Sequence, residues 1–117
     1  MNEQANVRPD HVKRAIVEML GRGAKRARFM TEIVAGLRRL RVGKDELERA
    51  LGELEAAGTI VLRDNYCADP HLAEVDLRVA ALLDQSAGAE GHAAALHEID
   101  LTWNKWLGEY LANHRCG

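Results

Sequence analysis

The sequence predicts a mainly helical α+β domain with a small β-hairpin, followed by a C-terminal amphipathic helix. Apolar residues recur at helical spacing in three segments before residue 58. A β-rich run, Thr59–Leu62, follows the third segment directly, and a long apolar face returns between His92 and Asn113. We therefore expect an N-terminal tail over 1–8, one folded domain over 9–84, a loop over 85–91 and a C-terminal helix over 92–117.

The first helix is expected to start at Pro9. Backbone N–H groups in the first turn of a helix have no acceptor within the helix, so the missing N–H of proline costs nothing there. Val12, Ile16 and Leu20 then recur at helical spacing, and the glycines from Gly21 onward end the segment. Residues 21–29 (GRGAKRARF) are interpreted as a basic connector.

Two further helices follow this connector. Thr31 is a plausible N-cap for a short second helix, with Glu32 favourable in its first turn. The segment 44–57 predicts the third helix most clearly, since acids favour its start and Gly58 is expected to cap its end. The apolar stripe of this helix comprises Leu47, Ala50, Leu51, Leu54 and Ala57.

The segment 71–84 has two interpretations. Val75, Leu77 and Val79 belong to an alternation typical of a strand, whereas Leu72, Val75 and Val79 also fit a helix opened by the Asp-Pro pair at 69–70. We prefer the strand, because the run Thr59–Leu62 needs a pairing partner.

The composition indicates a globular chain. Of 117 residues, 47% are hydrophobic and 29% charged, values that exclude wholesale disorder and a disulfide scaffold. No stretch has the roughly 20 apolar residues that span a bilayer, and we expect no membrane association. The two cysteines, Cys67 and Cys116, favour free thiols in a reducing compartment, so a cytoplasmic location is expected.

The net charge of −2 hides an asymmetry. The first 63 residues have thirteen Lys/Arg against nine Asp/Glu, and the remainder has three against nine. Between Arg22 and Lys44, eight basic residues accompany a single acid, Glu32. Such clustering is typical of a surface that contacts a polyanion, although a merely solvated basic surface is the alternative.

The segments 30–37 (MTEIVAGL) and 44–60 (KDELERALGELEAAGTI) resemble a winged helix-turn-helix domain of the bacterial transcriptional-regulator type. The second segment is similar to a recognition helix that ends in glycine and leads into an apolar wing strand. The resemblance spans about residues 9–83 and implies that the third helix enters the major groove of double-stranded DNA. It implies a regulator of transcription and no enzyme.

The resemblance places Lys44 and Arg49 on the recognition helix, but three acids (Asp45, Glu46 and Glu48) share its first two turns. We therefore expect phosphate contacts to shift to the connector and to the turn before this helix, with Arg63 or Arg78 beside the wing. The predicted nucleic-acid-binding residues are Arg22, Lys25, Arg26, Arg28, Arg38, Arg39, Arg41, Lys44, Arg49 and Arg63.

The C-terminal helix holds both tryptophans of the chain. Its broad apolar face is expected to form a homodimer contact, because tryptophan and tyrosine are favoured interface anchors. The alternatives are packing of the tryptophans on the first helix of the same chain, a small-molecule pocket, or a protein-interaction module that uses this helix or the acidic third helix. The predicted dimer residues are Leu96, Ile99, Trp103, Trp106, Leu107, Tyr110 and Leu111.

Other chemistry finds little support in the sequence. Cys67, His71, His114 and Cys116 could supply four zinc ligands, but their spacing lacks the usual Cys-x-x-Cys and we expect no metal. There is no nucleophile elbow, P-loop or dinucleotide fingerprint, so neither catalysis nor a cofactor is expected.

Overall fold

The computed structural model of the chain describes residues 3–22, 27–65 and 67–113, with the backbone alone for residues 3–7. Within these residues the helices are α1 (Glu3–Gly21), α2 (Met30–Gly36), α3 (Lys44–Ala56) and α4 (Ala89–Asn113). The strands are β1 (Ala27–Phe29), β2 (Ile60–Arg63) and β3 (Val79–Leu82), and short 3-10 turns cover Arg38–Leu40, Pro70–Leu72 and Gln85–Ala87. The mainly helical α+β class is therefore confirmed.

The three strands form one antiparallel sheet in the order β1–β3–β2. In the register, Phe29 pairs with Val79 on one side of β3, and Ile60 pairs with Leu82 on the other. The β2–β3 hairpin was predicted, but β1 was not, because its residues lie in the segment interpreted as a basic connector. The sheet consequently has a third strand that joins the start of α2 to the hairpin.

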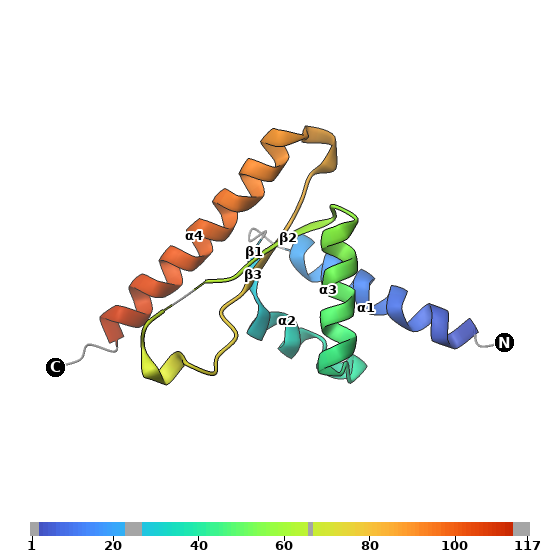
Figure 1. The fold of residues 1–117 in the computed structure, drawn as a ribbon, viewed down its shortest axis with the longest axis horizontal. Helices are drawn as coiled ribbons and strands as arrows, with labels where there is room; N and C mark the ends of the chain where they lie inside the picture. Colours follow the sequence, from blue (N-terminus) through green and yellow to red (C-terminus); the bar gives the residue numbers. More distant parts are fainter. Residues whose placement is uncertain (1–2, 23–26, 66, 114–117) are drawn as a thin grey trace.

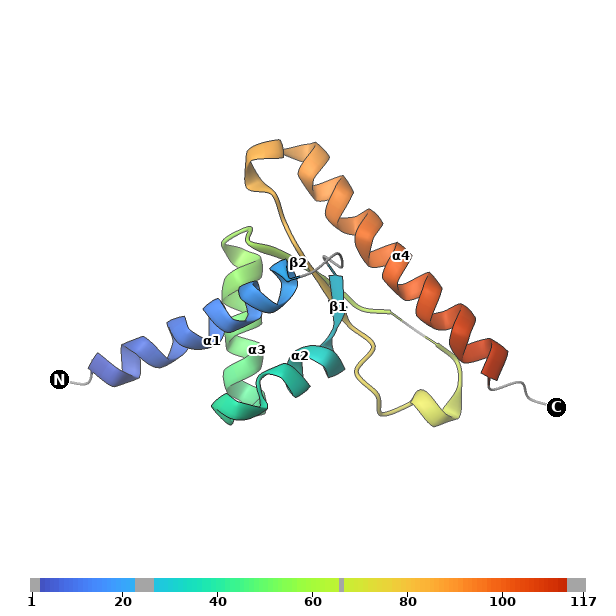
Figure 2. The ribbon, with the colours of Figure 1, turned by 180° about the vertical axis from the view of Figure 1, so that it is seen from behind.

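Helices cover both faces of this sheet. Ala80 of β3 packs into the core formed by α1, α2 and α3, whereas its neighbours Val79 and Ala81 pack with Ile99 of α4. This alternation follows the two-residue period of a strand. Figures 1 and 2 show α4 on one side of the sheet and the other three helices gathered on the opposite side.

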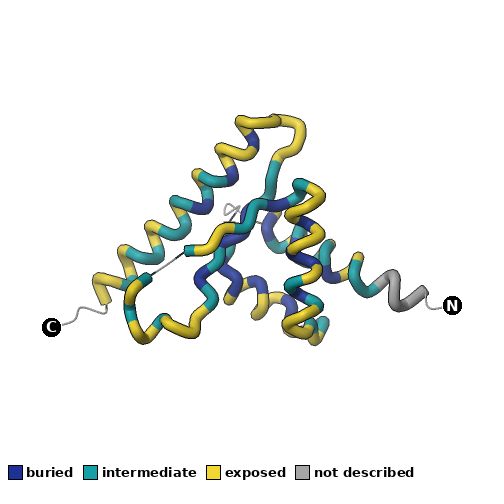
Figure 3. Tube along the Cα trace, viewed as in Figure 1, coloured by how far each residue is buried: buried dark blue, intermediate teal, exposed yellow. Residues whose placement is uncertain are grey.

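The core on the side of α1, α2 and α3 is aliphatic. Val12, Ile16 and Leu20 of α1 are fully buried, as predicted from their spacing. The stripe of α3 is confirmed at Leu47, Ala50, Leu51 and Leu54, which are buried, but Ala57 lies past the end of the helix and is exposed. Figure 3 shows this division of α3 into a buried and an exposed side.

Two helix starts differ from the predictions. The first helix begins at Glu3, not Pro9, so Pro9 lies inside α1 and part of the expected tail is helical. The second begins at Met30, so Thr31 is not its N-cap. The N-cap is Phe29, two residues earlier than predicted, and its backbone N–H donates to Glu32 Oε1 at 3.4 Å.

The end of α3 follows the prediction. Gly58 has φ +74°, the left-handed conformation that glycine adopts without a steric penalty. The backbone N–H of Thr59 then donates to the carbonyl of Leu54 at 2.9 Å, which closes the last turn and directs the chain into β2.

The segment 71–84 is a strand only in part. β3 covers Val79–Leu82, while the preceding residues belong to the long β2–β3 loop, in which Asp69 accepts a hydrogen bond from the backbone N–H of His71. The side chain of Asn65 donates to the carbonyl of Leu77 at 3.0 Å and holds the two ends of the loop together. The preference for a strand is therefore right at 79–82, and the apolar alternation before it pairs with no strand among the described residues.

The last helix starts three residues earlier than expected, at Ala89, after Gly88 with φ +59°. Its first turn packs closely on the preceding 3-10 turn, since a Cβ at Gly91 would collide with the carbonyl oxygen of Asp84. No helix in the described part of the chain is long and apolar enough to cross a membrane.

Candidate nucleic-acid interface

The turn between α2 and α3 presents a group of cations to solvent. Leu37 is buried and fixes the end of α2 to the core, while Arg38, Arg39, Arg41 and Lys44 are all exposed. Arg41 has φ 50°, a left-handed conformation that is uncommon for a residue with a side chain. This tight turn places four positive side chains next to the N-terminus of α3.

Arg8 of α1 holds this turn in place. Its guanidinium donates to both carboxylate oxygens of Glu46, at 2.7 and 3.1 Å, and to the carbonyl of Leu40 at 2.6 Å. The hydrogen bonds from Arg8 hold the pKa of Glu46 below its ordinary value. Arg8 therefore joins the first helix to the turn and neutralises one of the three acids that shared the start of α3.

Arg8 was missing from the predicted site. It was assigned to the N-terminal tail, and its partner Glu46 is 38 residues away in the chain. No local pattern links two residues at this separation, so only the packing of α1 beside α3 brings them together.

The acid Glu48 is also paired within the chain. Arg78, which immediately precedes β3, donates to the two carboxylate oxygens of Glu48 at 2.7 and 2.6 Å and also to Asp76 at 2.7 Å. These hydrogen bonds lower the pKa values of Glu48 and Asp76 and raise the pKa of Arg78. Arg78 is thus bound to α3 and to its own loop, and of the three acids near the start of α3 only Asp45 has no ion pair within the described residues.

Replacing Arg78 with Met is expected to weaken the pH dependence of stability in acid. Glu48 and Asp76 pair with Arg78 only when ionised, and their folded pKa values lie below the ordinary 4.5 and 3.8. The contribution of these two carboxylates to the free energy of unfolding is therefore fully present above the ordinary pKa values. It is lost as the pH falls through the lowered pKa values of the folded state. Because both carboxylates are about two-fifths exposed, we expect Arg78→Met to lower the free energy of unfolding by only about 1 kcal/mol at pH 7.

Urea unfolding at pH 7, 4 and 2.5 measures this effect. The free energy of unfolding of the wild type should fall more steeply on acidification than that of Arg78→Met. Arg63→Met is the control, since it removes only a more exposed ion pair with Asp100. Parallel acid profiles for Arg78→Met and the wild type would show that the network contributes nothing to folding.

The exposed face of α3 carries charges of both signs. Lys44, Asp45 and Arg49 are exposed along its first half, and Gly52, Glu53, Glu55 and Ala56 are exposed along the second half. A Cβ at Gly52 would meet no atom within 4 Å. Helix α3 therefore offers the cations Lys44 and Arg49 in its first half, followed by the small residues Gly52 and Ala56 and the acids Glu53 and Glu55.

The remaining predicted cations are distributed elsewhere. Arg22 is exposed at the end of α1, while Lys25 and Arg26 lie outside the described residues. Arg28 donates to the carbonyl of Met19 at 2.8 Å and to Glu32, and Arg63 donates to Asp100 of α4 at 2.6 Å. The structure thus brings together the four cations of the turn, with Arg49 following in α3, whereas Arg28 and Arg63 are engaged within the chain.

The aromatic residues of α4 pack against the sheet side of the molecule. Trp103 and Trp106 lie with ring centroids 6.2 and 5.5 Å from Phe29, and Tyr110 stacks on Trp106 at 5.1 Å. The tryptophans therefore contact Phe29, at the end of β1. The alternative that they pack on the first helix is wrong, because their partner within the chain is the sheet. Among the predicted dimer residues, Ile99 is fully buried, Leu96 and Leu107 are half-buried, and only Leu111 is more than half exposed.

The β2–β3 loop is attached to the same helix. Asp69 accepts a hydrogen bond from the hydroxyl of Tyr110 at 2.6 Å, and Arg63 at the other side of the loop reaches Asp100. Both contacts attach the loop to α4, while Arg78 at the end of the loop pairs with Glu48 of α3. Apart from Arg63 at its start and the paired Arg78, the described part of this loop supplies no arginine or lysine.

The possible zinc ligands are not gathered in the described part of the chain. Cys67 is a half-buried free thiol, His71 is exposed, and the described residues contain no group of three potential ligands. His114 and Cys116 lie outside the described residues.

Comparison of the chain with protein-family models, with curated proteins and with solved structures finds no match in any of the three.

Proposed function

We propose that the protein is a winged-helix DNA-binding regulator of transcription. The observation that carries this proposal is the exposed cationic turn, Arg38 to Lys44, fixed by Arg8 directly before α3. The order of elements from α1 to β3 and the strand order β1–β3–β2 are those expected of a winged helix-turn-helix domain. In such a domain the helix after the turn lies in the major groove, and its first residues meet the bases.

The pairing of charges near α3 supports a DNA partner more strongly than the sequence alone does. Acids beside a phosphate backbone are costly, but Arg8 and Arg78 pair with Glu46 and Glu48. The cations of the turn, in contrast, form no ion pair with any described residue, so they are available to phosphates. Asp45 then remains as an acceptor that suits the exocyclic amine of cytosine.

In this mechanism the turn positions the protein and α3 reads the bases. Arg38, Arg39 and Arg41 bind phosphates at the edge of the major groove, which sets the register but carries no sequence information. Lys44 and Arg49 reach base edges or further phosphates. The β2–β3 loop, attached to α4, contributes little.

The protein is also proposed to act as a homodimer, because paired half-sites on DNA match a two-fold symmetric protein. The predicted aromatic face is occupied by contacts within the chain, so the proposed contact uses the exposed apolar residues of α4. These are Leu101 and Leu111, with 52% and 53% of their surfaces exposed.

Titration of fluorescent genomic duplex fragments, followed by anisotropy at 50 and 200 mM salt, tests the proposal. Four or five phosphate contacts predict a slope of about −4 in log affinity against log salt, hence a loss of roughly 100-fold or more between the two salt concentrations. Size-exclusion chromatography with light scattering on the same samples gives the number of chains bound. Absence of binding at 50 mM salt would refute DNA binding, whatever the oligomeric state.

A further inference from the structure

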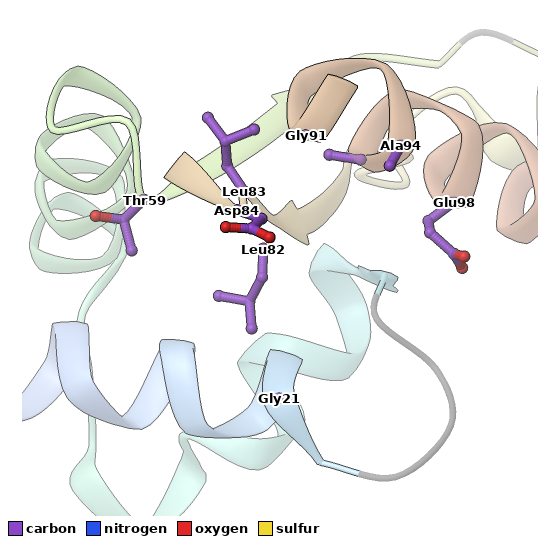
Figure 4. Close-up of a pocket in the computed structure, with 9 residues that line it drawn as sticks. Gly21, Thr59, Leu82, Leu83, Asp84, Gly91, Ala94 and Glu98 are labelled. Carbon is purple, nitrogen blue, oxygen red and sulfur yellow. The ribbon is translucent and has the colours of Figure 1, made fainter. Parts of the chain in front are cut away.

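A hollow of about 480 Å³ opens between the C-terminal end of α1, the ends of β2 and β3 that meet there, and the first half of α4. Figure 4 shows Leu82 pointing towards the end of α1 at Gly21, while Gly91, Ala94 and Glu98 follow one another along α4. Its size lies within the range of about 300–1,000 Å³ that is usual for small-molecule sites. The hollow is separate from the turn and from the exposed face of α3.

The lining of this hollow combines apolar surface with carboxylates. Leu82, Leu83 and Ala95 supply aliphatic surface, and Asp84 and Glu98 are the charged residues among those that line it. The carboxylate of Asp84 accepts hydrogen bonds from the backbone N–H and the hydroxyl of Ser86, so its position is fixed by the 3-10 turn. A ligand that fits this lining is apolar with one positive charge.

Glu98 is the residue best placed to bind that charge. It is half-buried on α4, and it makes no hydrogen bond or ion pair with any described residue. An ionised carboxylate beside apolar surface binds a cation more tightly than one in open water, because less competing solvent surrounds it.

A second hollow of about 370 Å³ lies farther along the same flank of α4 and shares Glu98 with the first. Phe29 and Trp106 line it, together with the carboxylates of Glu32 and Glu109 and the ammonium group of Lys105. Aromatic rings attract cations through their π faces. Glu98 therefore lies between an aliphatic hollow and an aromatic hollow. In the aromatic hollow, three carboxylates accompany a single cation, Lys105.

We propose that the hollow at Glu98 binds a small organic cation, with the ammonium group paired to Glu98 and the apolar body against Leu82, Leu83 and Ala95. Such a ligand contacts α1, the hairpin and α4 at once, so it joins the two layers of helices across the edge of the sheet. This proposal does not depend on DNA binding, and a separate binding experiment tests it.

Benzylammonium is the probe, and benzyl alcohol and benzoate are its neutral and anionic counterparts of similar size. Two-dimensional ¹H–¹⁵N spectra of the full chain at 150 mM salt follow each titration. Benzylammonium should shift the amides of Thr59, Leu82 and Glu98 with a Kd of about 1 mM or below, as expected for a ligand of this size. Benzyl alcohol should bind at least tenfold more weakly, and benzoate should not bind.

Glu98→Gln and Ala94→Trp test the two components of the site. Glu98→Gln should weaken benzylammonium about tenfold and leave benzyl alcohol unchanged, because it removes only the charge. Ala94 is exposed and lines the hollow, so a tryptophan there should block both probes without disturbing the core. Glu55→Gln removes an exposed carboxylate of α3, away from the hollow, and should change nothing.

Two results would overturn the proposal. One is equal affinity for benzylammonium and benzyl alcohol, and the other is unchanged benzylammonium affinity in Glu98→Gln. The dispersion of each variant's spectrum shows that it is folded, so a loss of binding is distinguished from a loss of structure.

Discussion

Ile99→Ala is expected to lower the free energy of unfolding by about 2–4 kcal/mol, because the removed atoms leave a cavity in a closed core. The side chain of Ile99 is 0% exposed and packs with Ala27, Phe29 and Val79 on the face of the sheet that α4 covers. Urea unfolding followed by tryptophan fluorescence measures the change, and Trp103 and Trp106 report directly from the same cluster.

Val34→Ala is the control, because Val34 lies on α2, outside the proposed dimer contact. Val34 is 53% exposed, so its truncation should change the free energy of unfolding by about 0.5 kcal/mol or less. Equal effects of the two truncations would mean that α4 does not pack on the sheet as described.

The third helix is the element that the sequence predicted best. Its apolar stripe, the acids at its start and Gly58 at its end are all local signals, and each depends on residues within about four positions. The strand after it follows for the same reason, because a β-branched run comes directly after a left-handed glycine.

Strand β1 could not be found in this way. Its three residues lie among basic residues and become a strand only by pairing with residues 79–81, about fifty positions later. The predicted pairing partner for β2 was right, but the sequence contains no local sign that a third strand joins the same sheet.

The ion pairs of the acids in α3 also join residues that are far apart in the sequence. Glu46 and Glu48 were counted as a cost to DNA binding, because their partners Arg8 and Arg78 are 38 and 30 residues away. Arg63, predicted to contact phosphate, is bound to Asp100 of α4 for a similar reason. A sequence shows how many charges there are, whereas their pairing depends on which helices pack together.

The spacing of the apolar residues predicted the aromatic face of α4, but it did not predict which surface covers that face. A helix with this many large apolar residues must be covered, and periodicity alone does not tell whether the cover is the same chain or a second copy. The prediction favoured a dimer because a face with so many large side chains is more than a small core needs. With β1 added, Phe29 provides an aromatic surface on the same chain for Trp103 and Trp106.

Arg38→Glu combined with Arg39→Glu is expected to weaken duplex binding by about 60-fold or more at 100 mM salt. Each lost phosphate contact removes about 0.9 from the slope of log affinity against log salt, which corresponds to roughly eightfold at this salt concentration. Reversal of the charges adds repulsion, so the loss exceeds that of two alanine substitutions. Both side chains are exposed and have no ion pair among the described residues, so folding should be unaffected.

Arg14→Glu combined with Lys105→Glu makes the same change in net charge at exposed positions of α1 and α4. Charges farther than about 10 Å from the phosphates are screened at this salt concentration, so this control should lose less than about threefold in affinity. The salt slope separates the two explanations, because it should fall by about two units in the first variant and stay unchanged in the second. If both variants lose affinity equally with the same slope, the duplex responds to the overall charge of the protein and the turn before α3 is not the contact surface.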